Sequence, residues 1–450
     1  MKTLTNFPYN KVLVLGLAKS GEAAAQLLYD SGIDFRINDR LPLEENETAK
    51  RFTEMGCDVI TGKHPLTVLN DIDLVVKNPG IPYDNPIIQE ALNRDLPVIT
   101  EVELSYPLVE GPLIAITGSN GKTTTTTLIF ELLQAGGFNP LIAGNIGNVA
   151  SEVLREQKKD QPVVMELSSF QLKGTKTFKP DYAILLNLTE AHLDYHHSME
   201  DYINSKLKIF QNQTNEDVAI LNQLDSLTSS QQIPGNGKRV YFSVSNDSDS
   251  EITLTKDDQI QFRGNKLMSK NEVALPGNHN LENVLASIVI AKSFHISDEI
   301  IIEKLRTFIG VKHRLQFLER LNERLFYNDS KATNIQATSK AVRSFERPIV
   351  LIAGGLDRGN EFDELFDSFN NVTNCIVYGE SKDKLYEAGK RKGFKQITIT
   401  DSLVEATKKA YELSKPGDII LLSPACASWD QFPSFEARGD MFIETVHKLK

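Results

Sequence analysis

A glycine-rich loop that ends in a lysine and two threonines is the strongest candidate for chemistry in this 450-residue chain. An apolar run at residues 113–117 leads directly into Gly118-Ser119-Asn120-Gly121-Lys122-Thr123-Thr124, and a helical pattern follows. The glycines allow consecutive backbone N–H groups to curve around phosphate oxygens, and the helix N-terminus adds a favourable dipole. Lys122 supplies a cation for the β- and γ-phosphates, and the Thr123 hydroxyl is placed to bind Mg²⁺. The loop therefore predicts an ATP site.

Two features of this loop depart from common patterns. Ile116 stands where the general phosphate-loop motif has its first glycine. The threonines at 123–127 are a poor start for a helix, because each β-branched side chain loses χ1 freedom there. An ordinary glycine turn is the structural alternative. Residues that are unfavourable for a helix at such a loop, however, indicate that the loop has a function.

Further along the chain, oxygen and nitrogen donors appear that could hold a metal ion. Glu166 ends an apolar run, and open α/β sheets place ligands at the carboxyl ends of their strands. Carboxylate oxygens are also the ligands that Mg²⁺ prefers. His192 and His196 have zinc-like spacing if their segment is helical, but neither the glutamate of an HExxH motif nor a third ligand is nearby. Lys206, on a helix predicted over 201–210, indicates by itself only a solvated surface lysine.

A second glycine turn lies near the N-terminus. Gly16 and Gly21 stand between a predicted strand and helix, and Asp39 ends the next strand, as in a dinucleotide-binding fingerprint. Ala18 replaces the middle glycine, and its side chain opposes the usual close approach of a pyrophosphate. A tight turn without a ligand is therefore an equal alternative.

Strands and helices alternate through most of the chain, which predicts an α/β fold with parallel, doubly wound sheets. The predicted strands are 12–15, 35–38, 73–77, 97–100, 113–117, 163–167, 182–187, 218–222, 349–353, 375–378, 397–400 and 419–422, with a β-rich stretch at 239–274. Helices are predicted at 21–31, 87–94, 201–210 and 281–294. A chain of this length exceeds what one core usually supports. We expect three domains, a Rossmann-like domain at 1–100, a central phosphate-loop domain at 101–310 and a Rossmann-like domain at 311–450.

Charge and cysteine content limit the classes of partner. Sixty acidic against forty-nine basic residues give a net charge of −11, which disfavours nucleic acid and anionic membranes as partners. The three cysteines lie far apart and predict neither a disulfide framework nor a zinc site. The N-terminus lacks the apolar stretch of a signal peptide, and no apolar run reaches the ~20 residues that span a bilayer. We expect a cytoplasmic protein that is active as a monomer.

Further motifs, taken in order along the chain, resemble those of the Mur ligase family. The family's ATP loop is similar to Thr117–Thr124 and also lacks the first glycine of the general motif. The other matching motifs are Gly144-Asn145-Ile146-Gly147, Glu166–Gln171, Gly277–Asn280 with Asn283, His313-Arg314 and Asn328–Asn334, and together they cover nearly the whole chain. The Gly16–Gly21 turn and residues 423–432 look most like the members that add D-glutamate.

The resemblance implies an ATP-dependent amide ligase that adds D-glutamate to UDP-N-acetylmuramoyl-L-alanine in cytoplasmic peptidoglycan synthesis. The substrate carboxylate would attack the γ-phosphorus of ATP to give an acyl phosphate, which the amine of D-glutamate would then attack. Positioning and charge neutralisation by Lys122, Arg314 and two Mg²⁺ ions would dominate. Lys206 matches the family's carbamylated lysine, and its carbamate would complete the metal site with Thr123, Glu166 and His192.

The resemblance also assigns residues to each reactant. The UDP-sugar would contact Leu17, Ala18, Asp39, Arg40, Asn78, Gly80, Asn145, Ser168 and Gln171. The nucleotide would contact the phosphate loop together with Asn280, Asn283, Arg314 and Asp329, although Asn280 could instead cap the following helix. D-glutamate would contact Lys331, Thr333, Arg358, Ser428 and Phe435, where some relatives carry a lysine in place of Arg358.

Three alternatives remain at this stage. A nicotinamide-dependent dehydrogenase would use the turn from Gly16 to Asp39 but would leave the phosphate loop and Glu166 without a role. A non-catalytic nucleotide-binding module would need only the phosphate loop. Another Mur-type ligase or a folylpolyglutamate-type ligase is nearer, although the extra N-terminal domain disfavours the latter.

Overall fold

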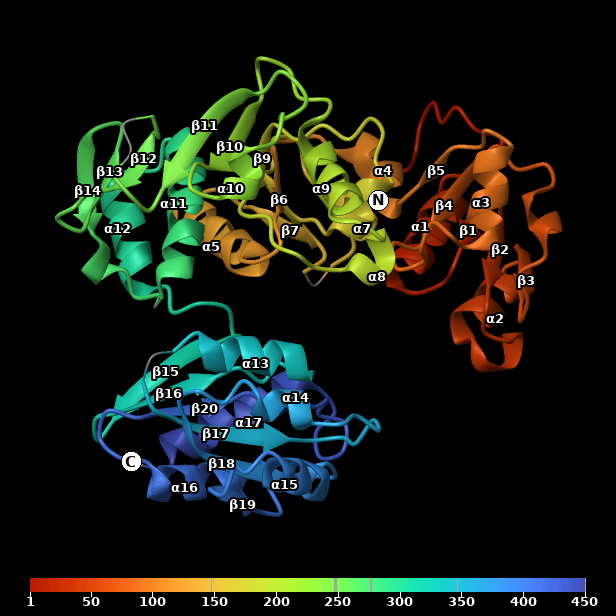
Figure 1. Cartoon of the computed structure of the whole chain (residues 1–450). Helices are drawn as coiled ribbons and strands as arrows, with labels where there is room; N and C mark the ends of the chain where they lie inside the picture. The colour runs from red at the N-terminus through yellow and green to blue at the C-terminus, as the bar shows by residue number, and fades with distance from the viewer. Residues whose placement is uncertain (147, 247–248, 276, 346, 450) are drawn as a thin grey trace. The chain divides into compact units, whose positions relative to one another are not determined.

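The computed structural model of the chain describes residues 1–146, 148–246, 249–275, 277–345 and 347–449 (Figure 1). The chain forms two compact units, and each is described by itself. The first comprises Met1–Val273 and Asn278–Arg306, and the second comprises Ala274–Gly277 and Thr307–Lys450. None of the helices in these described ranges is long and apolar enough to cross a membrane.

The first sheet, red and orange in Figure 1, is parallel throughout and has the strand order β3-β2-β1-β4-β5. Its strands are β1 (Lys11–Leu15), β2 (Asp34–Asp39), β3 (Asp58–Thr61), β4 (Leu74–Lys77) and β5 (Val98–Ile99). Its helices are α1 (Lys19–Asp30), α2 (Glu47–Glu54), α3 (Pro86–Asn93) and α4 (Glu101–Ser105). The central strands β1 and β4 are buried along almost their whole length, as expected of a parallel sheet covered on both faces.

The second sheet has the order β14-β13-β12-β11-β10-β9-β6-β8-β7, and its pairs are parallel except for β12 with β13 and β13 with β14. Its strands are β6 (Leu113–Thr117), β7 (Leu141–Gly144), β8 (Val163–Glu166), β9 (Tyr182–Leu185), β10 (Val218–Asn222), β11 (Lys238–Ser243), β12 (Ile252–Leu254), β13 (Gln259–Phe262) and β14 (Asn265–Ser269). The helices of this part are α5 (Lys122–Ala135), α6 (Ala150–Glu156), α7 (Ser169–Lys173), α8 (Leu193–His196), α9 (Met199–Leu207), α10 (Ser226–Ser229), α11 (Asn278–Ser293) and α12 (Asp298–Thr307). Helices α5 and α11 pack side by side against this sheet (Figure 1).

The third sheet forms the second unit and has the order β15-β16-β20-β17-β18-β19, in which only β15 is antiparallel. Its strands are β15 (Gln316–Leu321), β16 (Arg324–Asn328), β17 (Ile349–Gly354), β18 (Val372–Tyr378), β19 (Ile397–Ile399) and β20 (Ile419–Leu422). Its helices are α13 (Ile335–Arg343), α14 (Asp363–Phe366), α15 (Lys382–Arg391), α16 (Leu403–Leu413) and α17 (Phe435–His447). Successive residues of β17 alternate between two hydrophobic clusters, one on each face of the sheet.

The first two sheets share one hydrophobic core. A single cluster of buried side chains includes Val12 and Val14 of β1 together with Ala115 of β6 and Met165 of β8. This shared core explains why both sheets belong to one compact unit. The predicted division into three domains at residues 100 and 310 therefore stays a prediction.

The predicted α/β class with mostly parallel sheets is confirmed, and the strands at 218–222 and 419–422 agree with β10 and β20. The first helix begins at Lys19 rather than at residue 21, and Gly21 in its first turn packs against the preceding turn. A Cβ atom on Gly21 would lie 1.8 Å from the carbonyl oxygen of Gly16, which only glycine avoids. Strands β3, β7, β15 and β16 were not predicted, and the first three of them are only partly buried over much of their length.

Candidate functional site

The glycine-rich loop begins where β6, a central strand of its sheet, ends. β6 pairs with β8 on one side and with β9 on the other, so the loop lies beside the carboxyl ends of both strands. Residues that follow β9 hold the loop in place. The amides of Ser119 and Asn120 donate to the carbonyl and side-chain oxygens of Asn187, each at 2.9 Å. The Ser119 hydroxyl donates to the carbonyl of Thr189 at 3.0 Å.

The loop requires its glycines for conformation and for space. Gly118 and Gly121 have φ angles of +154° and +83°, which L side chains rarely adopt. A Cβ atom on Gly121 would lie 2.1 Å from the side-chain oxygen of Asn283 on α11. The same oxygen accepts from the hydroxyl of Thr125 at 3.2 Å. Asn283, predicted to contact adenine, is thus 2% exposed and packed against the phosphate loop.

Two lysine side chains meet at one carbonyl oxygen of the loop. The ammonium groups of Lys122 and Lys206 each lie 2.8 Å from the oxygen of Gly118, and Lys122 also donates to Ser119 O at 3.2 Å. The interpretation of Lys206 as a surface lysine is wrong, because α9 turns it inward and leaves it 1% exposed. Burial, and then the charge of Lys122, lowers the pKa of Lys206 well below that of a free lysine, while Glu166 partly opposes this.

Glu166 ends β8 next to the loop and has one unsatisfied oxygen. Its Oε1 accepts from the side-chain amide of Asn145 at 2.8 Å, which links two predicted site residues. Its Oε2 is buried and has no hydrogen-bond partner among the described residues. A buried carboxylate oxygen without a partner is costly unless a ligand binds it. Glu166 is therefore suited to hold a cation.

His192 lies at the start of α8 in a strained backbone conformation. Its φ of +57° and ψ of +33° place it in the left-handed region, which is uncommon for residues other than glycine. The ring is exposed and lies 4.9 Å from the centroid of Phe170 and 6.3 Å from that of Tyr202. Tyr202 in turn shares a hydrogen bond of 2.8 Å with Ser119, so this turn is joined to the phosphate loop.

His196 has different neighbours, which the sequence did not reveal. Its Nδ1 lies 2.6 Å from the carboxylate of Asp201, and its Nε2 lies 2.9 Å from the hydroxyl of Ser169. Lys173 donates to the same carboxylate at 2.6 Å. This network joins α7, α8 and α9, and it directs His196 away from the zinc-like pairing with His192.

A buried lysine holds the loop that follows β4. Lys77 is 1% exposed and donates to the carbonyls of Asn78 and Pro79 at 3.3 and 3.2 Å and to the hydroxyl of Tyr195 at 3.1 Å. Burial, with the nearby charge of Lys173, lowers the pKa of Lys77 to about 7. The Asn78–Gly80 loop is thereby tied to α8, the element that follows His192.

The N-terminal turn is braced by the carboxylate of Asp39. Its two oxygens accept from the amides of Leu17 at 2.7 Å and Leu41 at 2.9 Å. Leu17 is buried, whereas Ala18 and Arg40 are exposed beside it. The structure thus brings these predicted substrate residues together at the carboxyl ends of β1 and β2.

Ser168 and Gln171 are used locally as a capping box at the start of α7. The Ser168 hydroxyl accepts from the amide of Gln171 at 3.3 Å, and the Gln171 side chain accepts from the amide of Ser168 at 3.0 Å. Helix α11 begins at Asn278, so Asn280 lies within its first turn and does not precede it. Gly147, which ends one of the matching motifs, lies outside the described residues.

In the second unit, Asp329 is buried between β16 and β20. Its carboxylate accepts from the hydroxyl of Ser423 at 2.8 Å and from the amide of Leu315 at 3.1 Å. Burial raises the pKa of Asp329 to about 7, and the Ser423 hydrogen bond only partly offsets this. Arg314, one residue before Leu315, is exposed and contributes positive charge near the carboxylate.

The predicted D-glutamate residues lie on three loops of this unit and at the start of α17. A fully buried arginine, Arg438, connects two of the loops and was not predicted. It donates to the carbonyls of Ser330 and Cys426 at 2.8 and 3.0 Å. Lys331 lies over the ring of Phe435 at 5.8 Å, and Ser428 is 2% exposed. Thr333 and Arg358 are partly buried and exposed, respectively.

Comparisons with known proteins agree with this arrangement. Family models match residues 10–100 (Mur ligase MurD-like, N-terminal domain), 116–291 (Mur ligase middle domain) and 313–426 (Mur ligase, glutamate ligase domain). The chain is 50% identical over 450 residues to proteins of Bacillus cereus and Bacillus thuringiensis that are named UDP-N-acetylmuramoylalanine–D-glutamate ligase, with 100% of both chains covered in each case. The chain belongs to the Mur ligase family. As a Mur ligase it is an ATP-dependent amide ligase.

Solved structures of other Mur ligases have the same fold. UDP-N-acetylmuramate-alanine ligase MurC from Thermotoga maritima is 20% identical with a TM-score of 0.54, covering 98% of this chain and 100% of that one. MurF ligase from Thermotoga maritima, in complex with ADP, is 16% identical with a TM-score of 0.56, covering 93% and 96%. At these identities the likeness concerns the fold alone.

The donors of this Mur ligase fit a metal only in combination with other ligands. Within the described residues, no three His, Cys, Asp or Glu side chains gather closely enough to hold a metal ion. The unpartnered oxygen of Glu166, the buried Lys206 and the 4%-exposed Thr123 nevertheless belong to elements that adjoin the phosphate loop. Mg²⁺ usually keeps waters and phosphate oxygens as ligands, so a closed protein cage is not required.

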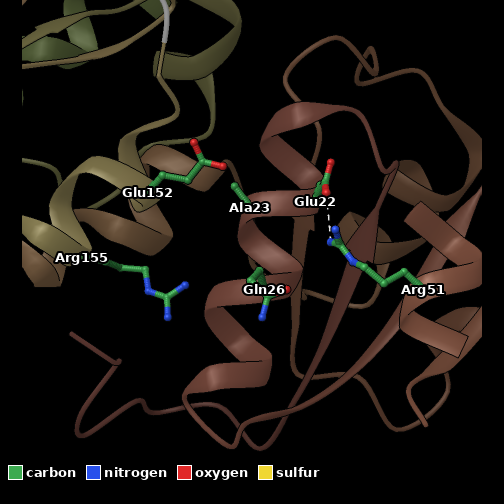
Figure 2. A pocket seen from close by; sticks show the side chains of 6 residues that line it. All are labelled: Glu22, Ala23, Gln26, Arg51, Glu152 and Arg155. Carbon is green, nitrogen blue, oxygen red and sulfur yellow. Dashed lines mark ion pairs between the residues drawn. The ribbon is translucent and has the colours of Figure 1, made fainter. Parts of the chain in front are cut away.

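A cavity elsewhere in the first unit contains none of the predicted site residues. Figure 2 shows it between α1, α2 and α6, lined by Glu22, Ala23, Gln26, Arg51, Glu152 and Arg155. Its arginines already have partners, because Arg51 pairs with Glu22 at 2.9 Å and Arg155 with Asp30 at 2.5 Å. The cavity is separate from the phosphate loop and has no evident part in the ligase reaction.

Proposed function

We propose that this Mur ligase joins D-glutamate to UDP-N-acetylmuramoyl-L-alanine and converts ATP to ADP and phosphate, in cytoplasmic peptidoglycan synthesis. The observation that carries the proposal is the 50% identity, over the full length of both chains, to proteins named for this reaction. The match of residues 10–100 to a MurD-like N-terminal domain points to the same substrate.

The reaction needs an activated carboxylate, because a carboxylate is a poor electrophile. An oxygen of the L-alanyl carboxylate attacks the γ-phosphorus of ATP, the bond to the bridging oxygen breaks, and ADP leaves. The amine of D-glutamate then attacks the acyl carbon and loses a proton as the bond to phosphate breaks. The protein has little covalent work to do, so positioning and charge neutralisation are its main contributions.

Lys122 is proposed to neutralise charge on the transferred phosphoryl group. In the structure its ammonium group donates to carbonyl oxygens inside the loop, at Gly118 and Ser119. Phosphate oxygens of ATP are stronger acceptors than carbonyls and would draw the same group into the nucleotide site. Arg314 is proposed to supply a second cation, and Asp329, Asn280 and Asn283 further nucleotide contacts.

Lys206 is proposed to be carbamylated. A lysine must be neutral to attack CO₂, and burial lowers the pKa of Lys206 in that direction. The resulting carbamate would carry a negative charge beside Lys122 and would replace the repulsion between two neighbouring amino groups with a favourable pair of opposite charges. This exchange gives a physical reason for a lysine at such a buried place.

Thr123, Glu166, His192 and carbamylated Lys206 are proposed to hold two Mg²⁺ ions. When bound, the ions would neutralise phosphate charge and orient the reacting oxygens. The Oε2 atom of Glu166 supports this assignment, because it is buried and has no hydrogen-bond partner among the described residues.

The remaining assignments concern the two other substrates. The UDP-sugar is proposed to bind Leu17, Ala18, Asp39, Arg40, Asn78, Gly80, Asn145, Ser168 and Gln171. D-glutamate is proposed to bind Lys331, Thr333, Arg358, Ser428 and Phe435.

Phosphate release in the presence of UDP-N-acetylmuramoyl-L-alanine and a panel of amino acids tests the proposal. We expect release with D-glutamate and little with L-glutamate, L-lysine or meso-diaminopimelate. Preference for another amino acid would assign the chain to a different Mur ligase reaction. Release that does not depend on any amino acid would indicate an ATPase instead of a ligase.

A further inference from the structure

Trp429 is an exposed aromatic residue with a single notable contact. It is the only tryptophan of the chain, and 64% of its surface is exposed. Its ring centroid lies 4.7 Å from the guanidinium carbon of Arg358. Burial therefore does not explain a tryptophan here, whereas the stack with Arg358 gives it a local role.

The backbone keeps the loops of these two residues together. The amides of Gly354 and Leu356 donate to the carbonyls of Pro424 and Ala427 at 2.8 and 3.0 Å. Gly355 lies so close that a Cβ atom there would be 2.2 Å from the oxygen of Ala427. The loop of Arg358 is thus held against the loop of Trp429 by backbone contacts. The two side chains are therefore kept near each other by the fold.

The carboxylate of the neighbouring Asp357 does not pair with the guanidinium of Arg358. Asp357 accepts from Lys384 at 2.7 Å and from the amide of Gly359 at 2.8 Å. Among the described residues, Arg358 makes no hydrogen bond or ion pair, so its five N–H donors face solvent. A cation that is oriented by a ring and keeps its donors available is suited to bind a carboxylate.

The second predicted D-glutamate cation has the same arrangement. Lys331 lies 5.8 Å from the ring centroid of Phe435, a residue already assigned to the D-glutamate site. Each of the two exposed cations thus has one aromatic ring beside it. Both predicted D-glutamate cations thus share this arrangement.

We propose that Trp429 is a positioning residue of the D-glutamate site, which holds the Arg358 guanidinium by stacking so that its donors meet a carboxylate of the amino-acid substrate. This inference rests on the proposed function. A free arginine loses side-chain entropy when it binds a ligand, and the stack reduces that loss before the substrate arrives. The KM for D-glutamate should respond, while the kcat and the KM for ATP should not.

The kinetic test compares Trp429→Ala and Trp429→Phe with the wild type by phosphate release at varied D-glutamate. Trp429→Ala should raise the KM for D-glutamate about 3- to 10-fold, and Trp429→Phe should stay within about twofold because a phenyl ring also stacks on a cation. The matched control is Tyr386→Ala, which removes a ring under Lys390 (4.2 Å) on α15 and should leave all constants unchanged. An unchanged KM in Trp429→Ala would overturn the proposal.

A double-mutant cycle separates positioning from direct contact. In an Arg358→Ala background, Trp429→Ala should have no further effect on the KM, because its role is exercised through Arg358. A further rise equal to that in the wild-type background would overturn the positioning role. If the wild type itself releases no phosphate with D-glutamate, the proposed function fails first, and the emission measurement below still tests the stack.

The emission of the single tryptophan reports on the stack without any substrate. Arg358→Ala should change the intensity or wavelength of Trp429 emission, whereas Arg391→Ala, at an exposed position on α15, should not. Identical emission of wild type and Arg358→Ala would show that the stack does not form in solution and would overturn the inference.

Discussion

Lys122 and Lys206 both contact the carbonyl oxygen of Gly118, but they are proposed to carry opposite charges in the reaction. Lys122 is proposed to meet phosphate with its positive charge, whereas burial lowers the pKa of Lys206 well below that of a free lysine. Two ammonium groups at one oxygen repel each other, and this repulsion is relieved if one becomes a carbamate. Single substitutions at the two positions should therefore have different consequences.

We predict that Lys122→Ala lowers ATP turnover by at least about 100-fold, because a charge that stabilises the transferred phosphoryl group is lost. Phosphate release and nucleotide affinity measure this, and an unchanged circular dichroism spectrum shows that the fold persists. The control is Lys158→Ala at an exposed position, which should be fully active. Near-wild-type turnover with unchanged affinity would disprove the assignment of the phosphate loop.

We predict that Lys206→Ala is inactive and that acetate, propionate or another short-chain acid partly restores its activity. A carbamate that acts only through its oxygens can be replaced by another carboxylate. The same acids should not rescue Lys122→Ala, which lacks a cation. Carbon-13 NMR with labelled bicarbonate should show a carbamate signal in the wild type only. Full activity of Lys206→Ala without added acid would rule out the role.

At the scale of secondary-structure elements, the contact between α4 and α6 contains a buried acid. Glu101 of α4 is 1% exposed and accepts from the amide of Ser151 of α6 at 2.5 Å. Burial raises the pKa of Glu101 from 4.5 to about 7. Between these values the folded chain holds a proton that the unfolded chain has released, so stability falls as pH rises through this window and levels off above pH 7.

Glu101→Gln keeps an acceptor oxygen for Ser151 but cannot ionise. We predict that it raises the free energy of unfolding of the first unit by on the order of 3 kcal/mol at pH 8 and by almost nothing below pH 4.5. Urea unfolding at pH 4.5, 6 and 8 measures the difference, with the exposed Glu156→Gln on α6 as control. A gain of the same size at pH 4.5 and 8 would assign the effect to packing and contradict the pH argument.

At the scale of the whole molecule, the proposed reaction assigns residues of both compact units to one set of reactants. Lys122 belongs to the first unit, and Arg314 and Lys331 belong to the second. Reacting atoms must approach to within ~3–3.5 Å for transfer. Binding should therefore bring the units into one closed arrangement that excludes water from the acyl phosphate.

We predict that an ATP analogue together with the UDP-substrate reduces the radius of gyration in small-angle scattering. Residues 310–312, just beyond the boundary of the units at 306/307, are the predicted hinge, and Gly310 there has a φ of +100°. Paired spin labels, one in each unit, should show a shorter distance on binding, and Lys122→Ala should show a smaller change. Unchanged scattering and distances would exclude closure.

The sequence by itself determined the features that depend on local pattern. The apolar run at 113–117 and the glycines that follow specify a strand and a phosphate loop, because backbone conformation there depends on residues that are adjacent in the chain. Alternating runs likewise predicted parallel α/β sheets. The ordered motifs predicted the Mur ligase family, which full-length identity then confirmed.

Only the tertiary structure decided which side chains share a site. The contact of Lys206 with Gly118 spans 88 positions of the chain, and that of Asn283 with Thr125 spans 158. Trp429 and Arg358 meet only because β17 and β20 are adjacent in their sheet. Hydrophobic periodicity predicts which face of an element is buried but not the element that it packs against. From the sequence alone, an isolated lysine such as Lys206 therefore resembles a surface residue, although the neighbouring strands bury it.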